Sequence, residues 1–151
     1  MRRSDREISD PAELDMMLRR QNVLHLGLWD GAEPYVVPMN YGYDGTALYL
    51  HSALEGRKIE AMRANPRVCF TVTAEQQVVP SDVPCGWSVK YRSLIGYGTA
   101  TLLETAEEKA AGLNVIMRQF TDKSFQFPSE ALAKTAVIRI EISEMTGKSN
   151  E

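Results

Sequence analysis

Residues 22–51 read NVLHLGLWDGAEPYVVPMNYGYDGTALYLH, and this stretch decides the fold class. It contains three apolar runs separated by two Asp-Gly pairs: 22–29, 35–43 and 46–51. An Asp-Gly pair between apolar runs is typical of the tight turn of a β-hairpin. The stretch therefore predicts a meander of three antiparallel strands, and not a strand–helix–strand unit with a parallel sheet.

Three more strands and three helices are expected in the rest of the chain. β-Branched and apolar residues favour strands at 67–73, 87–103 and 135–142. Capping residues and apolar spacing favour helices at 10–21, 54–65 and 105–120. The predicted fold class is mainly β with some α: a small antiparallel barrel of about six strands with the helices packed outside, as one domain over 1–151.

Single residues predict finer details of these strands. Pro38 cannot donate a ladder hydrogen bond, so its part of the second run lies at a sheet edge or a bulge. The long run 87–103 carries Gly96 and Gly98 near its middle, and strands often bend at such glycines. Residues 74–86 are expected to form a loop, and the segment 145–148 is on its own typical of a frayed tail.

Composition excludes several classes of function. A net charge of −3 over 151 residues is unfavourable for general binding to nucleic acid or anionic membranes. No run approaches the roughly 20 apolar residues of a membrane span, and no apolar signal segment follows the N-terminus, so a cytoplasmic location is expected. The two cysteines, Cys69 and Cys85, show neither disulfide nor zinc-ligand spacing, and no metal site is predicted.

The segment HSALEGRK, residues 51–58, is the most informative about function, because a strand is expected to pass into a helix there. Such a junction exposes unpaired N–H groups and the positive end of the helix dipole. Ser52 adds a hydroxyl, Gly56 permits close backbone approach, and Arg57 and Lys58 add positive charge. The segment is a candidate phosphate site, although these residues by themselves slightly favour a plain helix start that bears a solvated basic pair.

Two other segments are candidates for ligand contacts. The proline-interrupted run 37–41 leaves main-chain groups available to a planar heterocycle, with Asn40 and Tyr41 as polar or stacking partners, or it is a plain edge strand. In the segment 90–98, Arg92 and Ser93 face an anion, or the segment is a bent strand with charged residues pointing outward.

The two histidines receive different interpretations. His25 lies in an apolar run and is read as a structural histidine, whereas His51 adjoins the predicted phosphate site. Neither belongs to a Cys, Asp or Glu pattern of a metal site. Ser52 is next to His51, but the GxSxG elbow of hydrolases is absent.

Four segments in order are PMNYGYDG, LYLHSALEGRKIEAMRANPRVCFTV, KYRSLIGYGTATLLE and TAVIRIEISEMTGK. Together they resemble the FMN-binding split-barrel family related to pyridoxamine 5'-phosphate oxidase, and most of all its nitroimidazole-resistance (Nim) branch. The resemblance covers residues 10–148. It implies a six-stranded split β-barrel and a homodimer with FMN at the interface.

The resemblance also implies which residues contact the flavin. The phosphate side comprises His51, Ser52, Gly56, Arg57 and Lys58. The isoalloxazine side, largely through main chain, comprises Pro38, Met39, Asn40 and Tyr41. Arg92 and Ser93 are expected to touch the same or the partner's flavin, and Lys148, in the MTGK-like motif, is expected to close the site.

One departure bears on the activity. The C-terminal arginine and histidine that bind substrate in true pyridoxamine-phosphate oxidases have no match here, which argues against vitamin B6 oxidation. The resemblance implies instead a reductase that passes electrons from NAD(P)H through FMN to a small acceptor such as a nitroaromatic, with His51 as the candidate catalytic residue. The alternatives are a non-catalytic flavin- or haem-binding protein, with His25 or His51 as axial ligand, and a deazaflavin-dependent reductase.

Overall fold

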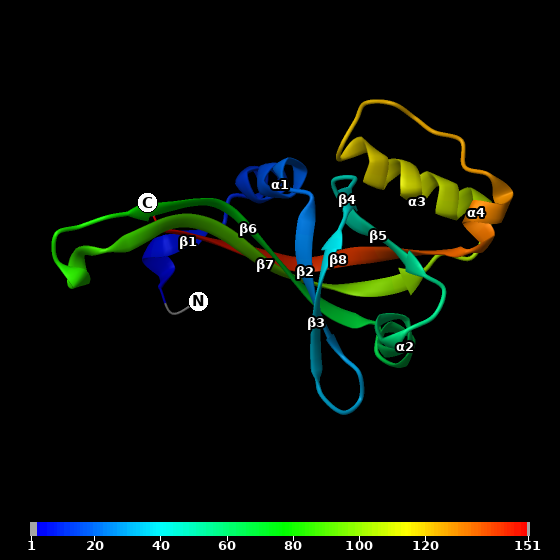
Figure 1. The fold of residues 1–151 in the computed structure, drawn as a ribbon, viewed down its shortest axis with the longest axis horizontal. Helices are drawn as coiled ribbons and strands as arrows, with labels where there is room; N and C mark the ends of the chain where they lie inside the picture. Colours follow the sequence, from blue (N-terminus) through cyan, green and yellow to red (C-terminus); the bar gives the residue numbers. More distant parts are fainter. Residues whose placement is uncertain (1–2, 151) are drawn as a thin grey trace.

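A computed structural model describes residues 3–150 and shows one antiparallel sheet that forms a split barrel (Figure 1). The strands are β1 (Glu7–Ile8), β2 (Val23–Trp29), β3 (Pro34–Asn40), β4 (Gly42–Tyr43), β5 (Ala47–Ala53), β6 (Arg67–Val79), β7 (Ser88–Leu102) and β8 (Thr135–Asn150). The helices are α1 (Pro11–Arg20), α2 (Arg57–Ala64), α3 (Ala106–Arg118) and α4 (Ser129–Ala133), with short 3₁₀ turns at Ser4–Arg6 and Pro84–Gly86. The predicted fold class is confirmed, with eight strands described instead of six.

The order of the strands corrects the predicted meander. It is β3-β2-β6-β7-β8-β5-β4, with β1 paired to β8. Both Asp-Gly turns form hairpins, β2–β3 and β4–β5, but these hairpins lie at opposite ends of the sheet. The chain leaves the ladder at Tyr41, whose side chain is buried in the core, and continues on the other side of the barrel. The expected three-strand meander is therefore wrong, although each turn was predicted correctly.

The core lies inside the barrel, where alternate residues of each strand point inward. Its largest fully buried side chains include Leu24 and Leu26 of β2, Leu48 and Leu50 of β5, and Phe70 of β6. α3 packs on the outer side of β4, β5 and β8 (Figure 1). Its Gly112 permits this contact, because a Cβ there would lie 2.9 Å from Cγ1 of Val137.

Side chains cap the N-terminal ends of α3 and α1. At α3, the Thr105 hydroxyl accepts from the Glu108 N–H at 3.2 Å, and the Glu108 carboxylate accepts from the Thr105 N–H at 3.1 Å, which completes a capping box. At α1, the Asp10 carboxylate accepts from Ala12 N–H at 3.0 Å. Glu13 completes no capping box with Asp10, although their spacing is that of one, and its carboxylate lies 3.9 Å from Arg92.

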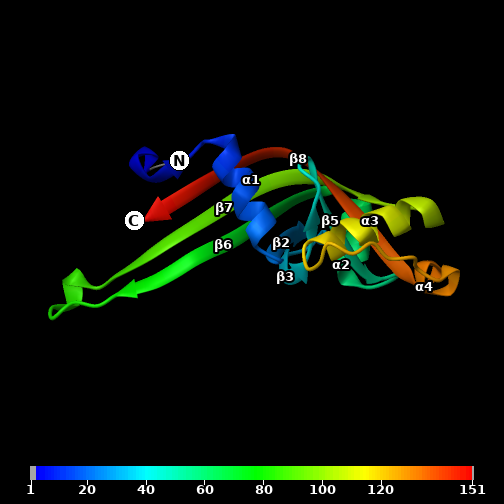
Figure 2. The same ribbon diagram turned by 90° about the horizontal axis from the view of Figure 1, so that it is seen from above.

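Several boundaries differ from the sequence prediction. β6 and β7 pair as far as Val79 and Ser88, past a bulge between Ala74 and Gln77, so the first part of the expected loop 74–86, up to Val79, is strand. The turn end of the β6–β7 hairpin projects beyond the barrel (Figure 2). β8 runs on to Asn150, and the segment 145–148 is paired with β7 and is not a frayed tail. α2 begins at Arg57, three residues later than expected, because Gly56 has a φ of +124°.

Two details were predicted correctly. Pro38 lies on β3, which is the end strand of the sheet. The register of β7 and β8 shifts between Tyr97 and Gly98, at the expected bend. Within residues 3–150, no helix has the length and apolar character needed to cross a bilayer.

Candidate functional site

The start of α2 has the open backbone that an anion site needs. Gly56 adopts φ +124° and ψ 167°, a region that is essentially restricted to glycine. Its carbonyl accepts from the N–H groups of Ile59 (2.9 Å) and Glu60 (3.1 Å) and so begins the helix. No described side chain caps this end, and a Cβ at Gly56 would have no described atom within 4 Å. The first N–H groups of α2 are therefore open to a ligand.

His51 and Ser52 lie just before this helix start, on the last part of β5. His51 is exposed and pairs with Val137 of β8. Ser52 is half-buried, and its hydroxyl donates to the carbonyl of Ala53 at 2.9 Å. The structure therefore places both residues near Gly56 along the chain, with Ala53, Leu54 and Glu55 between them and the helix.

The two basic residues of the segment differ in their environment. The Arg57 guanidinium contacts Asp30 and Glu33, both at 2.6 Å, and lies over the ring of Tyr35 at 4.3 Å. Lys58 is half-buried and makes no ion pair with any residue of the described chain. Lys58 is thus the cation that remains available to an anion at the start of α2.

The residues predicted to contact the isoalloxazine ring, 38–41, lie partly on the surface and partly in the core. Pro38 and Asn40 are exposed on β3, and the Asn40 amide donates to the carbonyl of Asn22 at 3.1 Å. Met39 is half-buried and packs against the core. Tyr41 is 0% exposed, and its hydroxyl donates to the Leu18 carbonyl at 2.7 Å. Burial raises the pKa of Tyr41. Because its ring is buried and its hydroxyl is bonded to Leu18, the predicted contact of Tyr41 with a ligand is left to its main chain.

Strand register places several candidates on one exposed surface. Pro38 pairs with His25, His25 with Thr71, and Thr71 with Ile95. Because paired residues point to the same side of a sheet, these four side chains share the side that faces away from the core. We call this surface of β3, β2, β6 and β7 the outer sheet face. Its exposed large apolar residues are Val23, Trp29, Val36, Val78, Val89, Ile95 and Tyr97.

Arg92 and Ser93, which the sequence prediction grouped together, point to opposite sides of the sheet. Ser93 lies two residues before Ile95, pairs with Lys148 and shares this face with it. Arg92 points to the opposite side, where its guanidinium lies 3.9 Å from Glu13 and 3.7 Å from Glu75. Ser93 and Lys148 therefore come together with Pro38 on one surface, and Arg92 does not.

His25 is exposed, unlike the structural histidine that its apolar run predicted. Its position in an apolar run indicated a structural histidine, yet the side chain is exposed on the outer sheet face. Strand alternation explains this exposure. Leu24 and Leu26 are both fully buried, so the residue between them points outward. The structural reading of His25 is therefore wrong.

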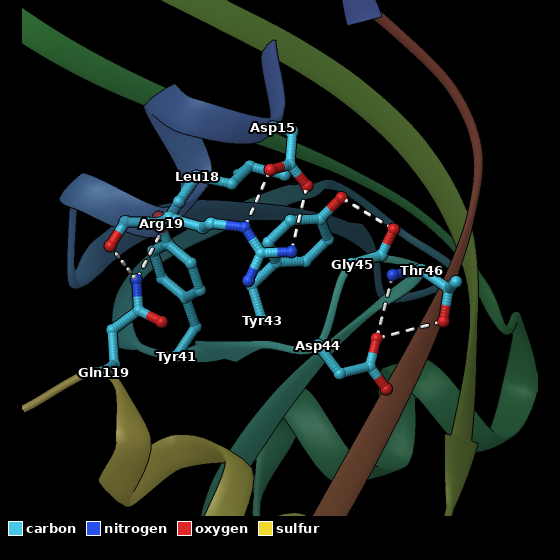
Figure 3. Close-up of polar contacts among 9 residues, drawn as sticks. All are labelled: Asp15, Leu18, Arg19, Tyr41, Tyr43, Asp44, Gly45, Thr46 and Gln119. Carbon is cyan, nitrogen blue, oxygen red and sulfur yellow. Dashed lines mark hydrogen bonds and ion pairs between the residues drawn. The ribbon is translucent and has the colours of Figure 1, made fainter. Parts of the chain in front are cut away.

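A hollow that the sequence did not predict lies beside α1. It has a volume of about 900 Å³ and is bounded by α1, Tyr43, Gly45 and the segment 142–145 of β8. Asp15 binds Arg19 at 2.7 Å, and Arg19 lies over the ring of Tyr43 at 5.2 Å (Figure 3). The Tyr43 hydroxyl donates to the Gly45 carbonyl at 2.9 Å, and burial beside Asp15 raises the pKa of Tyr43 to about 12.

Contacts near this hollow fix the end of α1 to the end of α3. The Gln119 amide donates to the carbonyls of Leu18 (2.8 Å) and Arg19 (3.1 Å), and also to that of Gln21. These bonds satisfy carbonyl groups at the end of α1 (Figure 3). The lining of the hollow contains none of the predicted flavin residues.

Comparisons with known proteins agree with the fold. The family model described as pyridoxamine 5'-phosphate oxidase matches residues 10–149. The crystal structure of a candidate 5-nitroimidazole antibiotic resistance protein from Bacteroides thetaiotaomicron is 32% identical, with a TM-score of 0.85, over 96% of this chain and 90% of that one. An FAD-binding protein from Mesorhizobium loti is 26% identical, with a TM-score of 0.71, over 97% and 98%.

Two further matches support less, because one has low sequence identity and the other covers only a short segment. A flavocytochrome from Azotobacter vinelandii has a TM-score of 0.88 at 21% identity, over 100% of this chain and 72% of that one, and shows the fold alone. An uncharacterised protein from Rhizobium meliloti is 42% identical over 40 residues, so the match spans 26% of this chain and about a quarter of that relative. Together with the match over residues 10–149, the fold shows that this chain belongs to the pyridoxamine 5'-phosphate oxidase family, as its four segments predicted.

Proposed function

We propose that this protein binds FMN and is an oxidoreductase that passes electrons from NAD(P)H through the flavin to a small acceptor such as a nitroaromatic. The observation that carries the proposal is the open, uncapped start of α2 at Gly56, with Lys58 beside it. A helix start of this kind fits a phosphate, because its N–H groups and dipole favour negative charge. The similarity to a candidate nitroimidazole resistance protein supports the acceptor class.

The edge strand β3 fits the planar part of the cofactor. β3 has only β2 as its neighbour in the described sheet, so one row of its main-chain groups is not used by the ladder. Pro38 and Asn40 are exposed along this strand. We assign to this edge the main-chain contacts that orient the ring system.

The outer sheet face fits a second copy of the chain. Val36, Ile95 and Tyr97 leave large apolar side chains exposed there, and large exposed apolar surfaces mark interaction sites. Ser93 and Lys148 lie on the same face. We therefore propose a homodimer in which this face is buried and both residues adjoin the flavin at the interface.

FMN, when bound, supplies the hydride and electron transfer itself. The contribution of the chain is to hold the phosphate at Gly56 and Lys58 and to orient the ring along β3. The exposed imidazole of His51, which lies between these two regions in the chain, is our candidate for holding a proton for the acceptor.

Absorption spectroscopy tests the proposal directly. We expect the purified protein to be yellow or to take up about one FMN per subunit, and to oxidise NADH or NADPH when a nitroaromatic is added. We expect His51→Ala to lower the turnover number while the affinity for FMN changes little. A protein that stays colourless in excess FMN would overturn the proposal.

Haem binding is a second candidate, supported by the exposure of His25. A histidine that is accessible on a sheet surface can serve as an axial ligand, and the relatives include a flavocytochrome. This candidate predicts a Soret band in haem-loaded protein that His25→Ala abolishes. A Soret band unaffected by His25→Ala and by His51→Ala would exclude both histidines as ligands.

A further inference from the structure

Asp30, the residue after β2, bonds to two elements at once. Its Oδ1 accepts from the N–H groups of Ala32 (2.9 Å) and Glu33 (2.8 Å) and closes the β2–β3 turn. Its Oδ2 accepts from Nε (2.8 Å) and Nη2 (2.6 Å) of Arg57, the first residue of α2. One carboxylate therefore joins the β2–β3 turn to the start of a helix 27 residues away in the chain.

The Arg57 guanidinium is fixed on several sides. Nη2 also donates to Glu33 Oε1 at 2.6 Å, and Cζ lies 4.3 Å from the centroid of the Tyr35 ring. The Glu33 side chain is 67% exposed, whereas that of Asp30 is only 17% exposed, so water weakens the Asp30 contact less. We call the unit of Asp30, Glu33 and Arg57 the Asp30 clamp.

The clamp uses the donors with which Arg57 would bind a phosphate. A guanidinium holds a phosphate best with two parallel N–H bonds, and both of the edges that can do so include Nη2. Nη2 already has two carboxylate partners. The N–H groups of Glu33 and Ala32, followed by Arg57, lower the pKa of Asp30 to about 2, so its carboxylate is ionised at neutral pH.

We propose that Asp30 is a positioning residue for the phosphate site, and that the Arg57 guanidinium is part of the clamp and not a phosphate ligand. The inference rests on the proposed flavin binding. In this arrangement the clamp fixes the first turn of α2, and the phosphate is met by the N–H groups behind Gly56 and by Lys58. The structure thus assigns a role at the phosphate site to a residue on the β2–β3 turn.

Binding of two flavins tests the inference, because riboflavin lacks the phosphate. We would titrate FMN and riboflavin by quenching of flavin fluorescence, for wild type, Asp30→Ala, Arg57→Ala and the double variant. We expect each single variant to weaken FMN by about tenfold, the size of one charge-assisted hydrogen bond, with riboflavin unchanged. The double variant should be no weaker than either single one, since both changes open the same clamp.

A matched control is Asp15→Ala, which removes the carboxylate partner that Arg19 contacts at 2.7 Å on α1. It should leave the ratio of the two affinities unchanged. Asp30→Asn keeps an acceptor for the turn while removing the charge. It therefore separates the effect of losing the charged clamp from the effect of disrupting the turn. Thermal unfolding checks that each variant is folded.

Two outcomes would overturn the inference. If Asp30→Ala tightens FMN, the carboxylate competes with phosphate for Arg57, which is then a direct ligand. If Asp30→Ala or Asp30→Asn weakens both flavins equally or neither, Asp30 does not position the phosphate site. Wild-type protein that binds neither flavin would instead refute the proposed function itself, so the two failures are distinguishable.

Discussion

His25 of β2 stands directly opposite Pro38 of the edge strand β3, and both side chains are exposed on the outer sheet face. The ladder continues from His25 through Thr71 to Ile95, so the surface beside the predicted ring contacts is continuous with an exposed apolar one. A partner that covers Ile95 therefore lies on the same face as Pro38. This relationship links the proposed cofactor site to the proposed subunit interface.

A charge on the outer sheet face should dissociate the proposed dimer. Ile95 is 40% exposed there, and Ile95→Glu would bury an unpaired carboxylate in the interface. We expect the variant to sediment as a monomer at concentrations where the wild type is a dimer. Phe120→Glu is the control, because Phe120 is 51% exposed just after α3 and away from this face. Equal sedimentation of Ile95→Glu and wild type would contradict the prediction.

Lys58 should contribute to the recognition of phosphate and not of the flavin ring. Lys58→Ala removes the cation at the start of α2 that makes no ion pair among residues 3–150. We expect FMN to bind about tenfold more weakly and riboflavin to bind unchanged, since one charge-assisted contact is lost. Added salt should weaken FMN binding to the wild type and affect the variant less.

Arg63→Ala is the matched control for Lys58, because Arg63 is an exposed cation in the last turn of the same helix. It should leave both affinities unchanged. Equal losses of FMN and riboflavin in Lys58→Ala would show that the lysine acts through the stability of α2 alone.

Gly56 and Gly31 offer a matched pair for backbone strain. Both have positive φ, +124° and +100°, and a Cβ at either would have no described atom within 4 Å. Alanine at either position should therefore destabilise the fold by strain alone, by about 1–3 kcal/mol. Gly56→Ala should weaken FMN more than Gly31→Ala, because it alters the backbone at the start of α2 directly, whereas Gly31 acts only through the turn that carries Asp30. Thermal unfolding and FMN titration of both variants measure the two effects separately.

Local patterns predicted the turns, the strands and the α3 cap, because each depends on residues close in sequence. The Asp-Gly turns form as expected. The two hairpins lie at opposite ends of the sheet because β2 pairs with β6 and β5 pairs with β8. These pairings join segments far apart in the chain and no local rule contains them, so the sequence favoured a simple meander.

The candidate site was predicted in part for the same reason. The phosphate-side segment is local, and the open backbone at Gly56 agrees with its glycine and its helix start. The partner of Arg57 could not be foreseen, because Asp30 lies on another hairpin. Strict alternation along β7 would have separated Arg92 from Ser93, since neighbours in a strand point to opposite sides.

The acid stability of the protein should depend on Asp30. Its pKa is about 2 in the folded protein, held down by two turn N–H groups and by Arg57, against an ordinary value near 3.9 when unfolded. Its contribution to stability is therefore complete above about pH 4 and is lost as the pH falls toward 2. The difference in free energy of unfolding between wild type and Asp30→Asn should be constant near neutral pH and shrink over that range.

Urea unfolding at pH values from 2.5 to 7 measures this difference. Asp82→Asn is the control, because Asp82 lies in the turn of the projecting hairpin and makes no ion pair within the described residues. A difference between wild type and Asp30→Asn that grows as the pH falls would contradict the assigned direction of the pKa shift.

Tyr41 should behave as a core residue, although the sequence placed it beside the ring. Tyr41→Phe keeps the buried ring and removes the hydroxyl that donates to the Leu18 carbonyl at 2.7 Å. That carbonyl retains the Gln119 amide at 2.8 Å, so no acceptor is left without a partner. We expect a loss of about 1 kcal/mol in the free energy of unfolding and no change in FMN affinity. A variant with normal stability and weakened FMN binding would instead place the hydroxyl at the cofactor.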